Sequence, residues 1–311
     1  MTRIGLHDGD GWKFPNLALM KLAAWHRSQG HEAARWSAIE VWEKVYASRV
    51  FTWSSRDPHL PAHTVEGGTG TGSAAQLLQD VEHICPDYSL YGLDYGLGFL
   101  TRGCPRRCPW CFVPEKEGQI TEHAEFGEFR HPRTDDLVLL DNNILAHPHG
   151  IAQIEAMAAA GMRVDFNQGL DARLLDDAAA RLLARLRWRA PLRLGCDTTA
   201  LLPAVRAAVE AARRHFPRAL TKSNVMVYVL VRDDLDDALE RVEALRELNV
   251  SPFAQPVRGR TGEPPRQVRD FARWVNHKAT FHRVPWSGYK ASRAGRGTAQ
   301  PGQLSMYEAT P

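Results

Sequence analysis

Three of the five cysteines lie within eight consecutive positions, as Cys104, Cys108 and Cys111 with the spacing C-x3-C-x2-C. Thiolates are soft metal ligands, and three of them on one short loop can converge on a single inorganic centre. On a cube-shaped iron–sulfur cluster, three cysteine ligands leave one iron free to be chelated by an exogenous molecule. This loop constrains the fold more than any other stretch, because the chain must hold three thiolates toward one centre.

The spacing resembles the signature of the radical S-adenosylmethionine (SAM) superfamily. Trp110 stands at the aromatic position before the third cysteine, which in that family packs near the adenine of SAM. The surrounding Thr-Arg-Gly-Cys-Pro and Cys-Phe-Val-Pro resemble the branch whose barrel follows a cobalamin-binding-type domain. The resemblance implies a [4Fe–4S] cluster on the three cysteines whose open iron binds SAM. An electron from the cluster then cleaves SAM to methionine and a 5′-deoxyadenosyl radical, which abstracts hydrogen from the substrate.

Two other kinds of cysteine site compete with a cluster. A structural zinc site needs four ligands, and His123 and His131 follow the loop, so a Cys3His zinc site is an alternative. A disulfide framework does not suit an odd number of cysteines in a chain of 311 residues. We interpret Cys85 as a packed thiol, with a fourth cluster ligand as the alternative.

Length and hydropathy indicate a globular protein with a large and a small domain. The sequence has no apolar run of about 18 residues, so we expect no membrane-spanning helix and no membrane partner. Its N-terminus lacks the apolar core of a signal peptide. We therefore expect a cytoplasmic protein, and that compartment suits oxygen-sensitive thiolate chemistry.

Basic residues gather near the C-terminus, although the net charge is only +3. Residues 256–300 contain ten Lys or Arg and two acidic residues, Glu263 and Asp270. Such a segment can attract nucleic acid. It is equally typical of a solvated surface and tail, which is the interpretation we favour.

Alternating strand and helix signals predict an α/β protein that begins with a small open parallel Rossmann-like sheet. We predict strands at 3–6, 32–36, 44–53 and from 64, and a helix at 16–29. Residues 1–75 resemble a reduced cobalamin-binding-type domain, with Gly67 and Gly68 after a late strand. The cobalt-ligating Asp-x-His-x-x-Gly pattern is absent, because His7 precedes Asp8, so cobalamin is not expected. The glycines at 67–72 can form a structural turn or cradle a phosphate, although the lysine of a P-loop is absent.

A second series of strand and helix signals follows a connector at 76–95. Apolar segments at 99–101, 137–141, 164–168, 192–197, 225–231 and 252–257 predict strands. The segments at 150–160, 176–186, 202–214, 234–248 and 266–276 predict helices, and 279–283 predicts a late strand or extended tail. The series resembles the partial (β/α)6 barrel of the radical SAM family, over residues 96–285. Residues 286–311 are expected to form a loosely ordered, polar basic tail.

Polar residues stand at the ends of several predicted barrel strands, where parallel barrels place their active sites. SAM needs acceptors for its amino group, a cation for its carboxylate and polar partners for its ribose. Arg173 is the candidate for the carboxylate. Asp171 and Asn143 can alternatively cap helical turns. The candidate SAM-binding residues are Trp110, Asp141, Asn143, Gln168, Asp171 and Arg173.

The fourth predicted strand ends in Cys196 and Asp197. Side chains alternate along a strand, so Cys196 shares a face with Leu192 and Leu194. Two leucines suit the outer face under the helices, which makes Cys196 a small buried side chain. Asp197 then points into the barrel and is our candidate catalytic residue.

The leading hypothesis is a radical SAM enzyme in which the cofactors carry the difficult chemistry. The resemblance implies an electron donor such as flavodoxin or ferredoxin. The substrate can be a small molecule, a peptide or a nucleic acid, because no motif indicates the reaction beyond hydrogen abstraction. The alternative is a non-catalytic iron–sulfur or zinc protein that binds a partner. The polar strand ends favour the enzyme.

Overall fold

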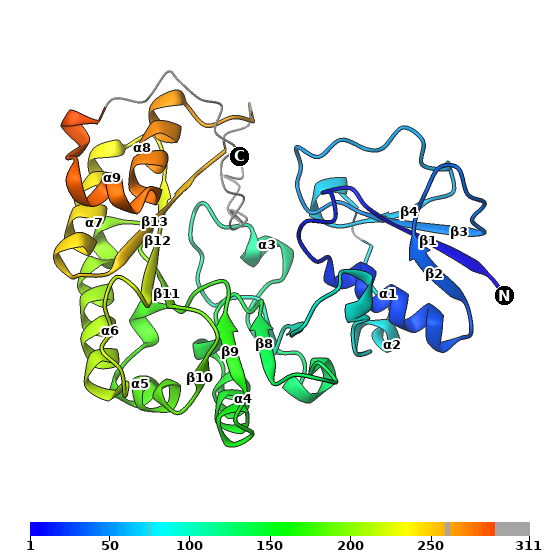
Figure 1. Ribbon diagram of the computed structural model, residues 1–311, viewed down its shortest axis with the longest axis horizontal. Helices are drawn as coiled ribbons and strands as arrows, with labels where there is room; N and C mark the ends of the chain where they lie inside the picture. Colours follow the sequence, from blue (N-terminus) through cyan, green and yellow to red (C-terminus); the bar gives the residue numbers. More distant parts are fainter. Residues whose placement is uncertain (74, 259–261, 290–311) are drawn as a thin grey trace. The chain divides into compact units, whose positions relative to one another are not determined.

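The computed structural model describes residues 1–73, 75–258 and 262–289 (Figure 1). The chain divides into two compact units, Met1–Phe99 with Ala124–Val138, and Leu100–His123 with Leu139–Pro311. The predicted domain boundaries at 1–75, 76–95, 96–285 and 286–311 stay predictions, and residues 290–311 of the predicted tail lie outside the described residues. Within the described residues, no helix combines the length and apolar character needed to cross a bilayer.

The first unit contains a parallel four-stranded sheet in the order β2-β1-β3-β4. Helix α1 (Leu17–Ser28) packs against this sheet (Figure 1), and the side chain of Asn16 caps its first turn by accepting the N–H of Leu19 at 3.2 Å. His26 of α1 contacts Tyr46, so the alternate residues of the same strand face away from the helix. That second face carries a small apolar cluster. The strands are β1 (Arg3–Asp8), β2 (Glu32–Arg35), β3 (Lys44–Ser48) and β4 (Val65–Gly67), and the cluster is Trp42, Val45, Ala47 and Leu60.

The rest of the first unit comprises short elements. A Cβ added to Gly96 or Gly98 would lie 2.4 Å or 2.5 Å from atoms of Phe129, so both positions require glycine. Within the connector at 76–95, helix α2 (Gln79–Glu82) begins without a side-chain cap and ends before Cys85-Pro86. The other elements are η1 (Thr69–Thr71), η2 (Tyr88–Leu90), β5 (Gly96–Gly98), η3 (Phe126–Phe129) and β8 (Asp136–Leu139), whose last residue belongs to the second unit.

The second unit alternates parallel strands with helices. Strands β11, β12 and β13 form one parallel sheet, β9 pairs in parallel with β10, and a parallel bridge joins Leu170 to Leu194. Helices α7 and α8 pack against this sheet (Figure 1). The strands are β9 (Arg163–Phe166), β10 (Arg187–Trp188), β11 (Leu192–Gly195), β12 (Val225–Val231) and β13 (Ser251–Pro256). The helices are η4 (Ile144–Ala146), α4 (Pro148–Ala159), η5 (Ala172–Leu174), α5 (Asp177–Ala184), η6 (Thr199–Leu201), α6 (Leu202–His215), α7 (Leu235–Glu247) and α8 (Arg266–Asn276).

The α/β class with parallel sheets is confirmed, and the prediction for 279–283 is wrong. That segment is helix α9 (Lys278–Arg283), which precedes η7 (Trp286–Gly288). The side chain of His277 caps α9 by accepting the N–H of Thr280. Phe281 is fully buried against Trp274, with ring centroids 5.0 Å apart. Capping and burial of one aromatic ring therefore outweigh the extended preference that the short segment suggested.

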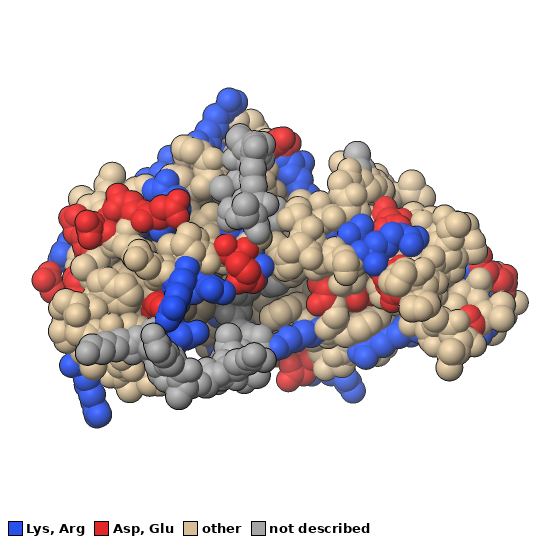
Figure 2. Space-filling view, turned by 90° about the horizontal axis from the view of Figure 1, so that it is seen from above, with Lys and Arg blue, Asp and Glu red and all other residues tan. Residues whose placement is uncertain are grey.

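Charges on the described surface are mixed. On the face shown in Figure 2, Lys and Arg side chains lie interspersed with Asp and Glu. In the basic C-terminal segment, Asp270 pairs with Arg266 and Arg273, and Glu263 pairs with Arg258 and Arg269. These ion pairs offset part of the positive charge of α8 and of the residues that precede it.

Candidate cofactor site at the cysteine loop

The three cysteines lie on a loop that is closed by its own backbone. Strands β6 (Thr101–Arg102) and β7 (Thr121–Glu122) pair antiparallel at its base, and α3 (Val113–Lys116) lies within it. The N–H of Cys104 donates to the carbonyl of Gly118 at 3.2 Å, and the N–H of His123 donates to the carbonyl of Leu100 at 2.9 Å. The loop is thus a pinned hairpin, which holds the thiols in one small region.

Gly103 allows the loop to close. Its backbone φ of +80° is one that residues other than glycine rarely adopt. A Cβ at this position would also lie 2.4 Å from the carbonyl oxygen of Gln119. Glu117 fixes the same turn, since it accepts the N–H of Gly103 at 3.0 Å and an N–H of Arg102 at 2.8 Å. Asn142 donates to Glu117 at 3.0 Å. Glu117 was not among the predicted site residues.

Asp141, a predicted SAM contact, lies beneath the start of the loop. Its buried carboxylate accepts the backbone N–H groups of Leu100 and Thr101 and the Thr101 hydroxyl, at 2.6–3.2 Å. Burial raises the pKa of Asp141 to about 6, although these hydrogen bonds favour the charged form. Through these hydrogen bonds, Asp141 positions the start of the cysteine loop.

The three thiols are half-buried and close enough to influence one another electrostatically. Burial raises the pKa of Cys108, and burial raises that of Cys111 to about 11. In the part of the chain that the structure describes, no three His, Cys, Asp or Glu side chains are grouped to hold one metal ion. A single zinc ion needs such a group, whereas the cysteines of a cube bind different irons and stand farther apart. His131, one of the two histidines named for a Cys3His zinc site, packs against Tyr88 in the first unit.

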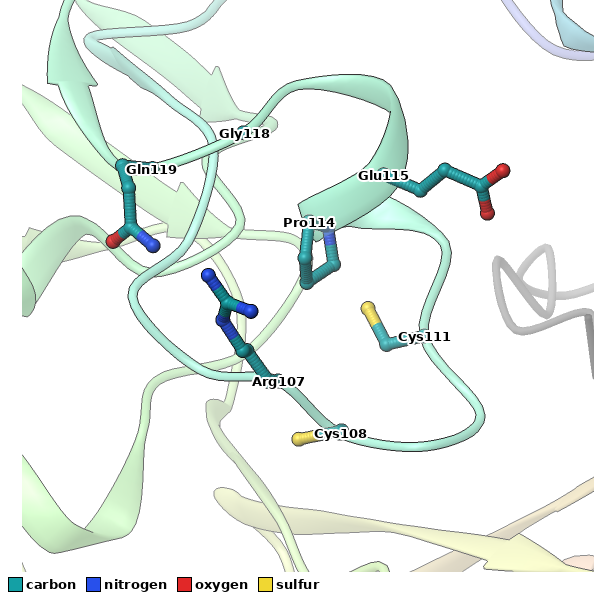
Figure 3. Close-up of a pocket in the computed structure, with 7 residues that line it drawn as sticks. All are labelled: Arg107, Cys108, Cys111, Pro114, Glu115, Gly118 and Gln119. Carbon is teal, nitrogen blue, oxygen red and sulfur yellow. The ribbon is translucent and has the colours of Figure 1, made fainter.

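A pocket of about 420 Å³ adjoins two of the thiols. In Figure 3, the sulfur of Cys111 turns toward Pro114 of α3, while the guanidinium of Arg107 extends toward Gln119. Thiols open to a pocket beside a cationic side chain suit an anionic metal–sulfur group. The lining residues are Arg107, Cys108, Cys111, Pro114, Glu115, Gly118 and Gln119.

Asp171 joins the cysteine loop to the segment after β9. Its carboxylate accepts from Nε of Arg106 at 2.9 Å and from Nε and Nη2 of Arg173 at 2.7 and 3.0 Å. Burial alone would raise the pKa of Asp171, but the two arginines outweigh it and hold that pKa below its ordinary range. The hydrogen bond to Asp171 raises the pKa of Arg173, and Cys108 and Cys104 contribute electrostatically. Arg173 is therefore a fixed cation beside two thiols.

Asn143 contacts both the network and a thiol. Its Nδ2 lies 3.2 Å from Asp171 Oδ2 and 3.6 Å from Cys104 Sγ. The backbone N–H of Arg106 also donates to this sulfur, at 3.4 Å. The Oδ1 atom of Asn143 is buried and has no hydrogen-bond partner among the described residues. N–H groups directed at Cys104 Sγ suit a sulfur that binds an iron–sulfur cluster. The unpaired Oδ1 of Asn143 suits a hydrogen-bond donor on a further ligand of that cluster.

A second group of side chains surrounds Trp110. The guanidinium of Arg232, which follows β12, lies 4.8 Å from the ring centroid of Trp110. Asp197 lies beside Trp110 and Arg232. Burial raises the pKa of Asp197, and the positive charges of Arg241 and Arg232 partly offset this rise. The indole Nε1 is buried without a hydrogen-bond partner within the described ranges. Cys196 is fully buried, and burial raises its pKa to about 12.

The structure thus brings the predicted residues into two groups. Asn143, Asp171 and Arg173 meet at Cys104, and Trp110 meets Asp197. Gln168 lies in the turn after β9. The functional roles of all these residues stay predictions. Sequence reasoning missed Arg106, Glu117 and Arg232; the only signal for Arg106 was a basic residue between two cysteines.

Comparison with known proteins supports the fold. No family model matches the sequence, and no curated protein matches it significantly. Among solved structures, the chain is similar to the radical SAM methyltransferase TsrM from Kitasatospora setae, solved with cobalamin and a [4Fe–4S] cluster bound. The TM-score is 0.59 at 12% identity, over 82% of this chain and 75% of that chain. The chain therefore has a radical SAM-like α/β fold.

Proposed function

We propose that this chain is a radical SAM enzyme. The observation that carries the proposal is the pinned hairpin of Cys104, Cys108 and Cys111, with Asn143 and the Asp171–Arg173 pair beside Cys104. Separate thiols suit three irons of one cube, and the adjacent polar groups suit a ligand on the fourth. The likeness to TsrM supports the fold that such chemistry uses.

Each side chain has a proposed task. The three cysteines hold the [4Fe–4S] cluster, which when bound supplies the electron that cleaves SAM. Arg173 attracts the carboxylate of SAM, and Oδ1 of Asn143 accepts from its amino group. Trp110 packs near the adenine, with Asp197 next to it as the candidate catalytic residue. Asp141 and Glu117 hold the loop in position.

The proposal includes an electron donor of the flavodoxin or ferredoxin kind and a cytoplasmic location. It leaves the substrate class open among small molecules, peptides and nucleic acids. TsrM was solved with cobalamin, but we propose that this chain works without it, because the Asp-x-His-x-x-Gly pattern is absent from its sequence. A stoichiometric corrin spectrum in protein purified from cobalamin-fed cells would contradict that part.

Electron paramagnetic resonance (EPR) of the anaerobically reconstituted, reduced protein tests the proposal. Binding of SAM to the open iron should change the spectrum of the cluster. An identical spectrum with and without SAM would favour the non-catalytic iron–sulfur alternative, and a chain that takes up zinc but no cluster would favour the zinc alternative.

A further inference from the structure

The amide of Asn143 has only one orientation that its neighbours accept. The side chain is 4% exposed, and its nearest polar neighbours are Cys104 Sγ at 3.6 Å and Asp171 Oδ2 at 3.2 Å. A thiolate and a carboxylate both accept hydrogen bonds, so the NH2 group must face them. An amide flipped by 180° would place oxygen against two negative groups.

Asp171 keeps this orientation in place. Arg106 and Arg173 hold its carboxylate through three hydrogen bonds at 2.7–3.0 Å. One amide proton of Asn143 therefore points to a fixed carboxylate, and the other points to the sulfur. The arrangement is partly buried, where a hydrogen bond to a charged group is stronger than in water.

We infer that Asn143 sets the reduction potential of the cluster through its N–H···S hydrogen bond to Cys104; this inference rests on the proposed function. One-electron reduction of a cluster adds negative charge to its sulfur ligands. A hydrogen bond to a ligand sulfur stabilises the reduced form more than the oxidised form and so raises the potential. Asn143 thereby makes the cluster easier to reduce by its electron donor.

The neighbouring residue provides a matched control. Asn142 is also an asparagine in the segment after β8, but its Nδ2 donates to Glu117 at 3.0 Å. Asn143→Ala removes the N–H donor and leaves a smaller side chain. Asn143→Leu removes the donor but keeps a side chain of about the size of asparagine. Asn142→Ala removes an amide of the same loop. Comparing them separates loss of the donor from general loosening of the segment.

The experiment is a redox titration of the reconstituted cluster, followed by EPR, without SAM. We expect a more negative midpoint potential in both Asn143 variants, and the wild-type potential in Asn142→Ala. Equal potentials in wild type and in cluster-loaded Asn143 variants would overturn the inference.

A second measurement uses the wild-type chain and needs no variant to load a cluster. Asparagine labelled with ¹⁵N at Nδ2 should give a nitrogen coupling to the reduced cluster in pulsed EPR. A loaded wild-type cluster without this coupling overturns the inference alone. A wild-type chain that takes up no cluster overturns the proposed function together with the inference.

Discussion

Arg106 donates from Nε to Oδ2 of Asp171 at 2.9 Å, which ties the loop between the first two cysteines to the segment after β9. The two residues are 65 positions apart in the sequence. Because Asp171 also holds Arg173 and Asn143, a single carboxylate organises the polar side of the cysteine loop.

Replacing Asp171 with Ala should loosen this side of the site. The change removes hydrogen bonds to two arginines and one amide, so we expect the free energy of unfolding to fall by about 1–3 kcal/mol. Asp176→Ala, which removes an exposed cap of α5, should cost about 1 kcal/mol and leave cluster uptake unchanged. Denaturant unfolding and iron content measure both. Wild-type iron retention in Asp171→Ala would show that the network does not support the cluster.

Gly103→Ala should disrupt the cysteine loop more than Gly118→Ala. Both glycines have positive φ, of +80° and +75°, so both variants carry the left-handed strain of about 1–2 kcal/mol. Only at Gly103 would the new Cβ meet backbone atoms, at 2.4 Å, since the space at Gly118 is open. We expect reduced iron incorporation for Gly103→Ala and near-normal incorporation for Gly118→Ala. Equal incorporation by the two variants would contradict the steric account.

Asp141 predicts a pH dependence with a definite sign. Its pKa is about 6 in the folded chain, raised by burial from the ordinary value of 3.8. The folded state therefore binds its proton more tightly, and this contribution to stability is present below pH 4 and lost as the pH rises to about 6. The shift corresponds to about 3 kcal/mol.

The comparison with Asp141→Asn isolates this titration. The free energy of unfolding of the cluster-free wild type should fall relative to that of the variant between pH 4 and pH 7. A constant difference across that range would show that Asp141 does not titrate in this way.

Asp197→Ala should weaken SAM binding, while Cys196→Ala should not. Asp197 lies beside Trp110 and Arg232, whereas Cys196 is fully buried away from solvent. Equilibrium binding of SAM to the reconstituted variants measures the difference, which we expect to be at least about tenfold, or about 1.4 kcal/mol. A defect confined to Cys196→Ala would show that Cys196, and not Asp197, points into the barrel.

Much of the fold follows from local sequence patterns. The strand predicted at 225–231 coincides with β12, because seven consecutive apolar residues cannot form an amphipathic surface helix. The helix at 266–276 coincides with α8, which has a clear apolar face. Strand β10 has two residues, which is too short for any periodicity to indicate.

The site is less predictable, because its contacts are long-range. The cysteine spacing alone indicates a shared centre, but Asp141 finds its partners about 40 positions earlier, on the backbone of Leu100 and Thr101. Nearly every residue has a backbone N–H group, so the sequence does not indicate which of them will donate to Asp141. Arg106 and Glu117 look like ordinary surface charges until the fold brings Asp171 and Gly103 to them.

Reductive cleavage of SAM tests the central claim most directly. The reconstituted wild-type protein, reduced anaerobically with SAM, should release 5′-deoxyadenosine, quantified by liquid chromatography and mass spectrometry. Ala variants of Cys104, Cys108 and Cys111 should each abolish the product, and Cys85→Ala should form it at the wild-type rate. Product formation that persists in any of the three loop variants, or its absence from a cluster-loaded wild type, would contradict the account.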